Sequence, residues 1–101
     1  KPREIPVDVM MSAFDRWIDD PPTEERTLRL RYVLALLLVR KRALKLHSIR
    51  REGSEDILVV RRHSSSETID IPAVELDESR LAEVEAELFD ELESTCSAGE
   101  V

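Results

Sequence analysis

Apolar positions along the chain follow first a helical and then a strand-like spacing. In residues 6–19, apolar side chains recur every three or four positions, which predicts a helix with one buried face. Residues 24–41 predict a second helix, and the eight consecutive non-polar residues 32–39 make it apolar on every side. Because such a helix presents apolar surface in all directions, we expect the rest of this small chain to enclose it.

After the second helix the spacing changes to two, which is typical of β-strands. A first strand alternates leucine with charged residues, and the short, β-branched run 57–60 predicts a central strand. Residues 68–71 predict a third strand that stops at Pro72. Turns at 52–55, which contains a glycine suited to a positive φ, and at 63–66 join the three into an antiparallel meander.

The register of the second hairpin follows if serines 64–65 form its two-residue loop. Val60 then pairs with Ile69 and Leu58 with Ile71, which places four apolar side chains on one face of the sheet. We expect this face to be the core face.

The first strand leaves two alternatives open. Leu44 and Leu46 point to one face of the sheet and Ile49 to the other. Either a β-bulge lies between them or the first turn has three residues.

The C-terminal segment predicts a third helix, with Asp77 as its N-cap. We expect this helix to end near residue 93 and residues 94–101 to form a disordered tail. The predicted fold is therefore α+β, in the order α-α-β-β-β-α. A three-stranded antiparallel meander packs on the central apolar helix 24–41, the flanking helices complete the cover, and residues 1–93 make a single domain.

Charge is distributed unevenly along the chain, whose net charge is -7. Residues 1–25 hold three basic and seven acidic side chains, 26–62 hold eleven basic and three acidic, and 63–101 hold one basic and twelve acidic. One interpretation is that the basic middle and the acidic end lie against each other in the fold. The other is a basic patch that binds an acidic partner.

A basic edge is the candidate site for nucleic acid, because phosphate contacts need clustered cations. No aromatic residue is interleaved with it to stack on bases, and the acidic last helix is available to cover it. Its residues come from the end of the second helix and the adjoining strands: Arg40, Lys41, Arg42, Lys45, Arg50, Arg51, Arg61 and Arg62.

The apolar face of the first helix is a second candidate site. It belongs either to the core or to a surface that docks on a protein partner. The residues of this face are Met10, Met11, Phe14, Trp17 and Ile18.

Residues suited to catalysis or metal binding are few and scattered. His47 and His63 are the only histidines and lack ligand-like spacing, while Cys96, the only cysteine, lies in the expected tail. The two glycines, Gly53 and Gly99, exclude a phosphate-binding glycine-rich loop. We therefore expect a chain that is not an enzyme, with no catalytic residue, no cofactor and no metal.

The single cysteine and the shortness of the apolar run indicate a cytoplasmic protein without a membrane span. A spanning helix needs about 20 apolar residues, whereas Arg31 and Arg40 bracket the run here. Because the sequence starts at Lys1, we also expect it to be a piece of a longer protein.

Two stretches of the chain resemble the C-terminal half of a group of small, uncharacterised planctomycete proteins. These are 30–44, with the leucine-rich run between arginines, and 71–78, which follows the meander. The likeness spans about residues 5–93 and implies a bacterial protein whose upstream half, zinc-ribbon-like in that group, is absent here. It implies no activity or site residues.

The absence of recognisable chemistry and the large apolar helical surface favour a non-enzymatic interaction or scaffold module. We expect it to bind a protein partner or to form a homo-oligomer. The alternative is a regulatory module that contacts nucleic acid through the basic edge, residues 40–62.

Overall fold

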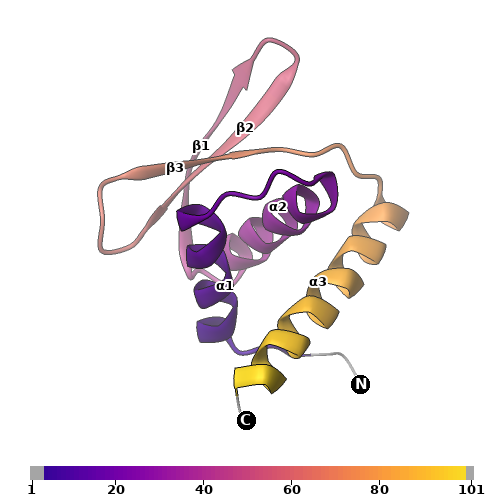
Figure 1. The fold of residues 1–101 in the computed structure, drawn as a ribbon. Helices are drawn as coiled ribbons and strands as arrows, with labels where there is room; N and C mark the ends of the chain where they lie inside the picture. The colour runs from indigo at the N-terminus through magenta and orange to yellow at the C-terminus, as the bar shows by residue number, and fades with distance from the viewer. Residues whose placement is uncertain (1–3, 100–101) are drawn as a thin grey trace.

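The computed structural model describes residues 4–99, with side chains to Ser94, and has the predicted α-α-β-β-β-α order of an α+β fold. A three-stranded antiparallel sheet lies on one side of α2, while α1 and α3 pack beside that helix (Figure 1). The elements are α1 (Val7–Asp19), α2 (Glu25–Arg40), β1 (Leu44–Glu52), β2 (Glu55–Arg62), β3 (Thr68–Pro72) and α3 (Glu78–Gly99).

The central helix α2 is enclosed along most of its length, as its apolar sequence predicts. Leu34, Ala35 and Leu38 are completely buried. The enclosure is incomplete on one side, where Leu36 and Val39 are only partly buried. The core around α2 also includes the inner face of α1, the stripe of α3 formed by Val84, Leu88 and Leu92, and the sheet face that turns toward the helices.

The two ends of α2 are closed differently. Glu24 occupies the N-cap position, and its side chain forms no capping hydrogen bond. At the other end Arg42 has a φ of 63°, a left-handed conformation that glycine adopts more readily. The N–H of Ala43 donates to the carbonyl of Leu38 and that of Arg42 to the carbonyl of Val39, which is the Schellman pattern. This strained turn leads directly into β1.

The second hairpin has the predicted register, with Val60 opposite Ile69 and Leu58 opposite Ile71. All four side chains face the helices; Leu58, Val60 and Ile71 belong to the core, and the partly buried Ile69 packs against it. We call this side of the sheet the inner face and the opposite side the outer face. The strand order β1-β2-β3 makes β2 the central strand, as its apolar sequence predicts.

The first hairpin resolves the alternative that the sequence leaves open. A β-bulge lies at His47, between the pairs Leu46–Val60 and Ser48–Val59, and the turn after Glu52 has only two residues. Gly53 begins that turn with a φ of 63°, as in a type II′ hairpin. Because the bulge adds one residue, Leu46 and Ile49 both lie on the inner face.

The last helix is longer than the sequence predicts. It begins as expected, since the N–H of Arg80 donates to the carboxylate of Asp77 at 2.7 Å. It does not end near residue 93 but continues to Gly99, because no proline or glycine interrupts residues 78–98. The expected disordered tail is therefore wrong for residues 94–99, and residues 100–101 lie outside the described residues.

Candidate interaction surface

The apolar face of α1 belongs mainly to the core. Met10 and Phe14 are buried and Trp17 is 9% exposed, while Met11 and Ile18 are partly buried. Packing of α1 against α2 therefore removes Met10, Phe14 and Trp17 from the surface. Of the two interpretations of this face, burial favours the core for these three residues.

Carboxylates of neighbouring elements neutralise three of the predicted basic residues. The Arg50 guanidinium crosses the outer face of β2 to reach β3, and its hydrogen bonds to Asp70 and then Glu52 raise its pKa. This bridge passes over Ile57 and Val59, which are buried although they face away from the helices. The ion pairs are Arg50 with Asp70 (2.7 Å), Arg51 with Asp56 (3.4 Å) and Arg62 with Asp15 (2.6 Å).

Two other basic residues of the sheet have no carboxylate partner within the described residues. Lys45 and Arg61 lie directly opposite each other in the β1–β2 ladder, so two positive charges share the outer face. Arg40, at the end of α2, and Lys41 and Arg42, in the turn before β1, are exposed. The structure therefore divides the eight predicted basic residues into paired and unpaired groups.

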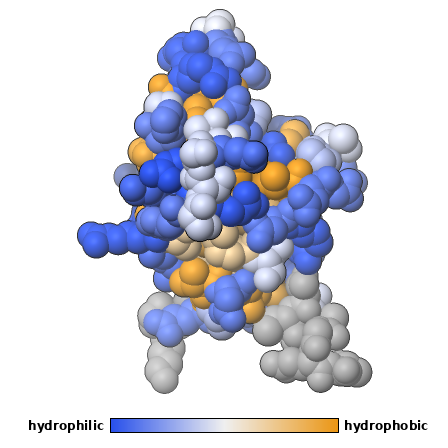
Figure 2. Space-filling view, turned by 90° about the vertical axis from the view of Figure 1, so that its left-hand side faces the viewer, coloured by the Kyte–Doolittle hydropathy of each residue, from blue (hydrophilic) through white to orange (hydrophobic). Residues whose placement is uncertain are grey.

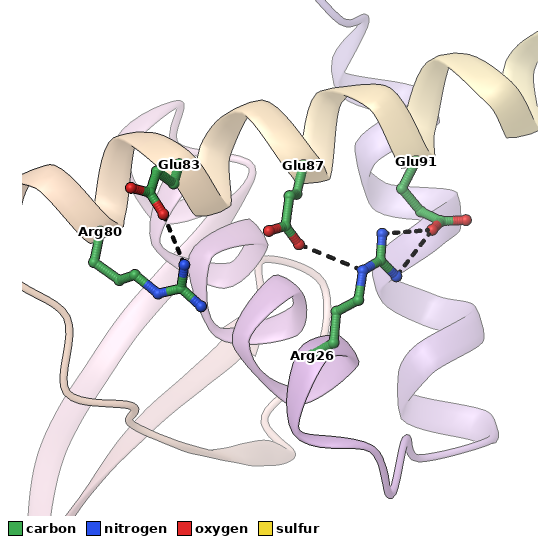
Figure 3. Close-up of polar contacts among 5 residues, drawn as sticks. All are labelled: Arg26, Arg80, Glu83, Glu87 and Glu91. Carbon is green, nitrogen blue, oxygen red and sulfur yellow. Dashed lines mark hydrogen bonds and ion pairs between the residues drawn. The ribbon is translucent and has the colours of Figure 1, made fainter.

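The acidic helix α3 packs against the other helices and not over the basic strands. Figure 3 shows its link to α2, where the Arg26 guanidinium lies 3.4 Å from a carboxylate oxygen of Glu87 and 3.4 Å from one of Glu91. Arg80 forms a further pair with Glu83, at 2.7 Å within α3. The basic middle and the acidic C-terminal segment thus meet through Arg26, while the basic edge at 40–62 is left uncovered by α3.

Beyond the helices, the distal part of the β1–β2 hairpin projects as an arm, which we define as residues 46–59 (Figure 1). On its inner face Leu46 is 48% exposed and Ile49 is 64% exposed. Their cross-strand partners Val60 and Leu58 on β2 are buried, so the helices cover the inner face of β2 but not that of β1 at these positions. Most of the upper surface in Figure 2 is hydrophilic, and apolar surface there forms separate patches. The inner face of β1 is therefore an uncovered apolar strip on an edge strand.

Both histidines of the chain line one shallow, open hollow, although the sequence separates them by sixteen positions. We call it the serine hollow; its lining residues are His47, Arg61, His63, Ser64, Ser65 and Ser66. The bulge at His47 and the turn after β2 bring these residues together. No sequence signal predicts this, because the position of the bulge depends on the pairing of the strands.

Burial shifts the pKa values of two neighbouring ionisable groups of α2. Burial, and then the negative charge of Asp56, raise the pKa of Tyr32. Arg31 is only 8% exposed, its buried Nε atom has no hydrogen-bond partner among the described residues, and burial lowers its pKa. Tyr32 lines a second depression beneath the arm, together with Arg51, Asp56 and the 73–76 segment.

Neither a metal cluster nor a membrane span is found within residues 4–99. No three His, Cys, Asp or Glu side chains of the described part converge as metal ligands would. None of the described helices combines the length and hydrophobicity needed to cross a bilayer.

Comparison with protein-family models, with curated proteins and with solved structures finds no match to this chain. The resemblance to the planctomycete group stays a prediction. Inferences about function therefore depend on the geometry described above.

Proposed function

We propose that this chain is a non-enzymatic interaction module that binds an acidic, extended segment of another protein along β1. The observation that supports this most is the exposure of Leu46 and Ile49 on the inner face of an edge strand. An edge strand offers unpaired backbone N–H and C=O groups, and an added strand would cover the apolar strip beside it.

The charge of β1 favours an acidic partner over a second copy of the chain. Lys45, Arg50 and Arg51 belong to this strand, and β1 contains one carboxylate, Glu52. Antiparallel pairing of β1 with another β1 would bring like charges together and oppose association. A negatively charged strand would instead be attracted to the unpaired Lys45.

The two faces of β1 also suggest the pattern of the partner. Leu46 and Ile49 occupy the inner face, together with Arg51, which pairs with Asp56, whereas Lys45 and Arg50 occupy the outer face, as the pairing with β2 requires. A strand that alternates apolar and acidic residues would place its apolar side chains beside Leu46 and Ile49 and its acidic side chains beside Lys45 and Arg50. The bulge at His47 interrupts the edge, so we assign continuous backbone pairing to residues 48–52.

A nucleic-acid interface along the whole basic edge has less support. Arg50, Arg51 and Arg62 are each engaged by a carboxylate of the same chain. A polyanion would have to displace these carboxylates in order to contact the whole edge.

The experiment is an NMR titration of the ¹⁵N-labelled chain with an acetylated peptide of alternating valine and glutamate. The peptide has nine residues, the length of β1. We expect saturable shifts of the amides of residues 44–52 and none in α3. A matched peptide of valine and lysine should not bind, because Lys45 would repel it.

The variant Ile49→Ser is the matched test of the apolar strip. Ile49 is 64% exposed, so we expect the free energy of unfolding to change by less than about 0.5 kcal/mol. Peptide affinity should fall at least about threefold, since the covered apolar contact is lost. Equal binding of both peptides, or undiminished binding by Ile49→Ser, would contradict the proposal. Sedimentation of the free chain distinguishes peptide binding from self-association, because self-association would produce dimers without peptide.

A further inference from the structure

We infer that the serine hollow binds a phosphoryl dianion, either inorganic phosphate or a phosphate monoester. The hollow lies on the side of β2 that joins β3, and its lining residues donate hydrogen bonds or can hold positive charge. This inference concerns the outer face and the turn after β2. It shares only Lys45 with the peptide proposal, whose apolar contacts, Leu46 and Ile49, lie on the inner face of β1.

Arg61 is the central cation of this site. It is partly buried, and its Nη1 atom donates to the carbonyls of Ser65 at 3.0 Å and Arg62 at 3.4 Å. These bonds fix the guanidinium against the turn. Its Nε and Nη2 atoms have no partner among the described residues and remain available as donors. A fixed guanidinium with free donors matches the oxygens of a phosphoryl group.

The charge of Arg61 is reinforced and not neutralised. Lys45 lies directly opposite it across the ladder on the same face, beside the hollow and not in its lining, and neither residue forms an ion pair within the described part of the chain. Like charges in this arrangement repel each other, and a bound anion would relieve the repulsion. Glu67 is the nearest carboxylate in sequence, but it does not line the hollow.

The turn supplies further donors. The hydroxyl oxygen of Ser65 accepts the N–H of Glu67 at 3.1 Å, which leaves its own hydrogen free to donate. His63 is held by a 2.8 Å hydrogen bond from its Nε2 to the carbonyl of Arg42. This bond connects the hollow to the strained turn before β1. His47 enters from the bulge, a feature that frequently redirects a side chain at a binding site.

A single phosphoryl group fits this arrangement better than a nucleic-acid strand. A strand needs a row of free cations, whereas the other cations of the sheet, Arg50, Arg51 and Arg62, are engaged by carboxylates. The two unpaired cations of the described sheet, Lys45 and Arg61, lie together at one point on its outer face. Donors from β1, β2 and the turn after β2 can surround one tetrahedral anion there.

The test is a titration of the ¹⁵N-labelled chain with inorganic phosphate at constant ionic strength, with chloride as the control. We expect saturable shifts of the amides of residues 61–67 and 47 with phosphate and none with chloride. A parallel titration with O-phosphoserine distinguishes the two sources, because tighter binding identifies a monoester and equal binding identifies free phosphate.

Two variants and one control make the result specific. Lys45→Gln, which removes no internal hydrogen bond, should weaken phosphate binding about two- to fivefold. Arg61→Gln should abolish saturation, while Arg51→Gln, a cation on the inner face, should bind as the parent does.

Three results would overturn the inference. One is a set of shifts that never saturate, and another is undiminished binding by both Lys45→Gln and Arg61→Gln. The third is binding of a DNA duplex at far lower concentration with a steep salt dependence, which would identify a nucleic-acid surface. Ile49→Ser should bind phosphate normally, so failure of the peptide proposal and failure of this one are distinguishable.

Discussion

The three helices and the hairpin arm differ in how completely they bury their apolar side chains. In the helices, Phe14, Leu34 and Leu88 are fully buried, each by a neighbouring element. In the arm, residues 57–59 of β2 are buried on both faces of the sheet. The neighbouring strand β1 exposes Leu46 and Ile49 on its inner face. The difference indicates that the helices complete a core and that β1 is left for something else to cover.

The same two regions also differ in charge. Acidic α3 is tied to α2 through Arg26 and lies away from the strands (Figures 1 and 3). The strands keep positive charge at Lys45 and Arg61, which no carboxylate of residues 4–99 neutralises. An acidic ligand would therefore be attracted to the sheet and repelled by α3.

The largest expected effect is the loss of stability when a helical core residue is truncated. Leu34 is completely buried, so Leu34→Ala should lower the free energy of unfolding by about 2–5 kcal/mol. The fluorescence of Trp17, the only tryptophan, reports the transition in a urea titration. Ile49→Ser in the arm is the matched control. Equal losses for the two variants would remove the distinction between a closed core and an open arm.

The turn that joins the two regions should gain stability when its strain is removed. Arg42 has a φ of 63° without being glycine, so Arg42→Gly should raise the free energy of unfolding by about 0.5–1 kcal/mol. Arg40→Gly is the control, because glycine inside α2 should destabilise by a similar amount. Destabilisation by Arg42→Gly in the same urea titration would show that the arginine side chain matters more than the backbone strain.

The smallest expected effect is a pH dependence where the arm meets the helices. Burial and the charge of Asp56 raise the pKa of Tyr32 above 10.0 in the folded chain. The unfolded chain therefore loses this proton first, so the stabilisation is complete below pH 10 and is lost as pH rises through the folded pKa. Tyr32 is the only tyrosine, so absorbance near 295 nm follows it alone.

Two variants identify the source of the Tyr32 shift. Asp56→Asn should lower the folded pKa toward its ordinary value without restoring it, because burial is the larger cause. Tyr32→Phe should abolish the alkaline loss of stability attributed to this group. A Tyr32 that titrates at 10.0 in the folded chain would show that this side chain is not partly buried beside Asp56 as described.

The sequence predicts those parts of the fold that depend on local pattern. Apolar spacing predicts the helices, and the alternation around Val60 and Ile69 predicts the register of the second hairpin. The sequence predicts the bulge at His47 only as one of two alternatives. A three-residue turn after β1 would change the pairing of β1 with β2 in a similar way, and the sequence does not distinguish the two. The left-handed conformation of Arg42 is missed. Glycine usually occupies such a position, and no glycine follows α2 to indicate it.

The candidate site is predicted less well than the fold. The sequence locates the basic residues but not their ion-pair partners. Asp15, the partner of Arg62, and Asp70, the partner of Arg50, are distant in sequence and become neighbours only through tertiary packing. For the same reason the serine hollow is missed, because its two histidines meet only once β1, β2 and the following turn are in place. Exposure of Ile49 also depends on which strand the helices cover.

Hydrogen exchange of the free and peptide-bound chain tests the central claim most directly. We expect the amides of α2 to exchange only through global unfolding, and those β1 amides that point away from β2 to exchange rapidly in the free chain. The valine–glutamate peptide should protect these same β1 amides and leave α2 unchanged. Protection of the β1 edge already present in the free, monomeric chain, or no added protection with peptide, would contradict the account.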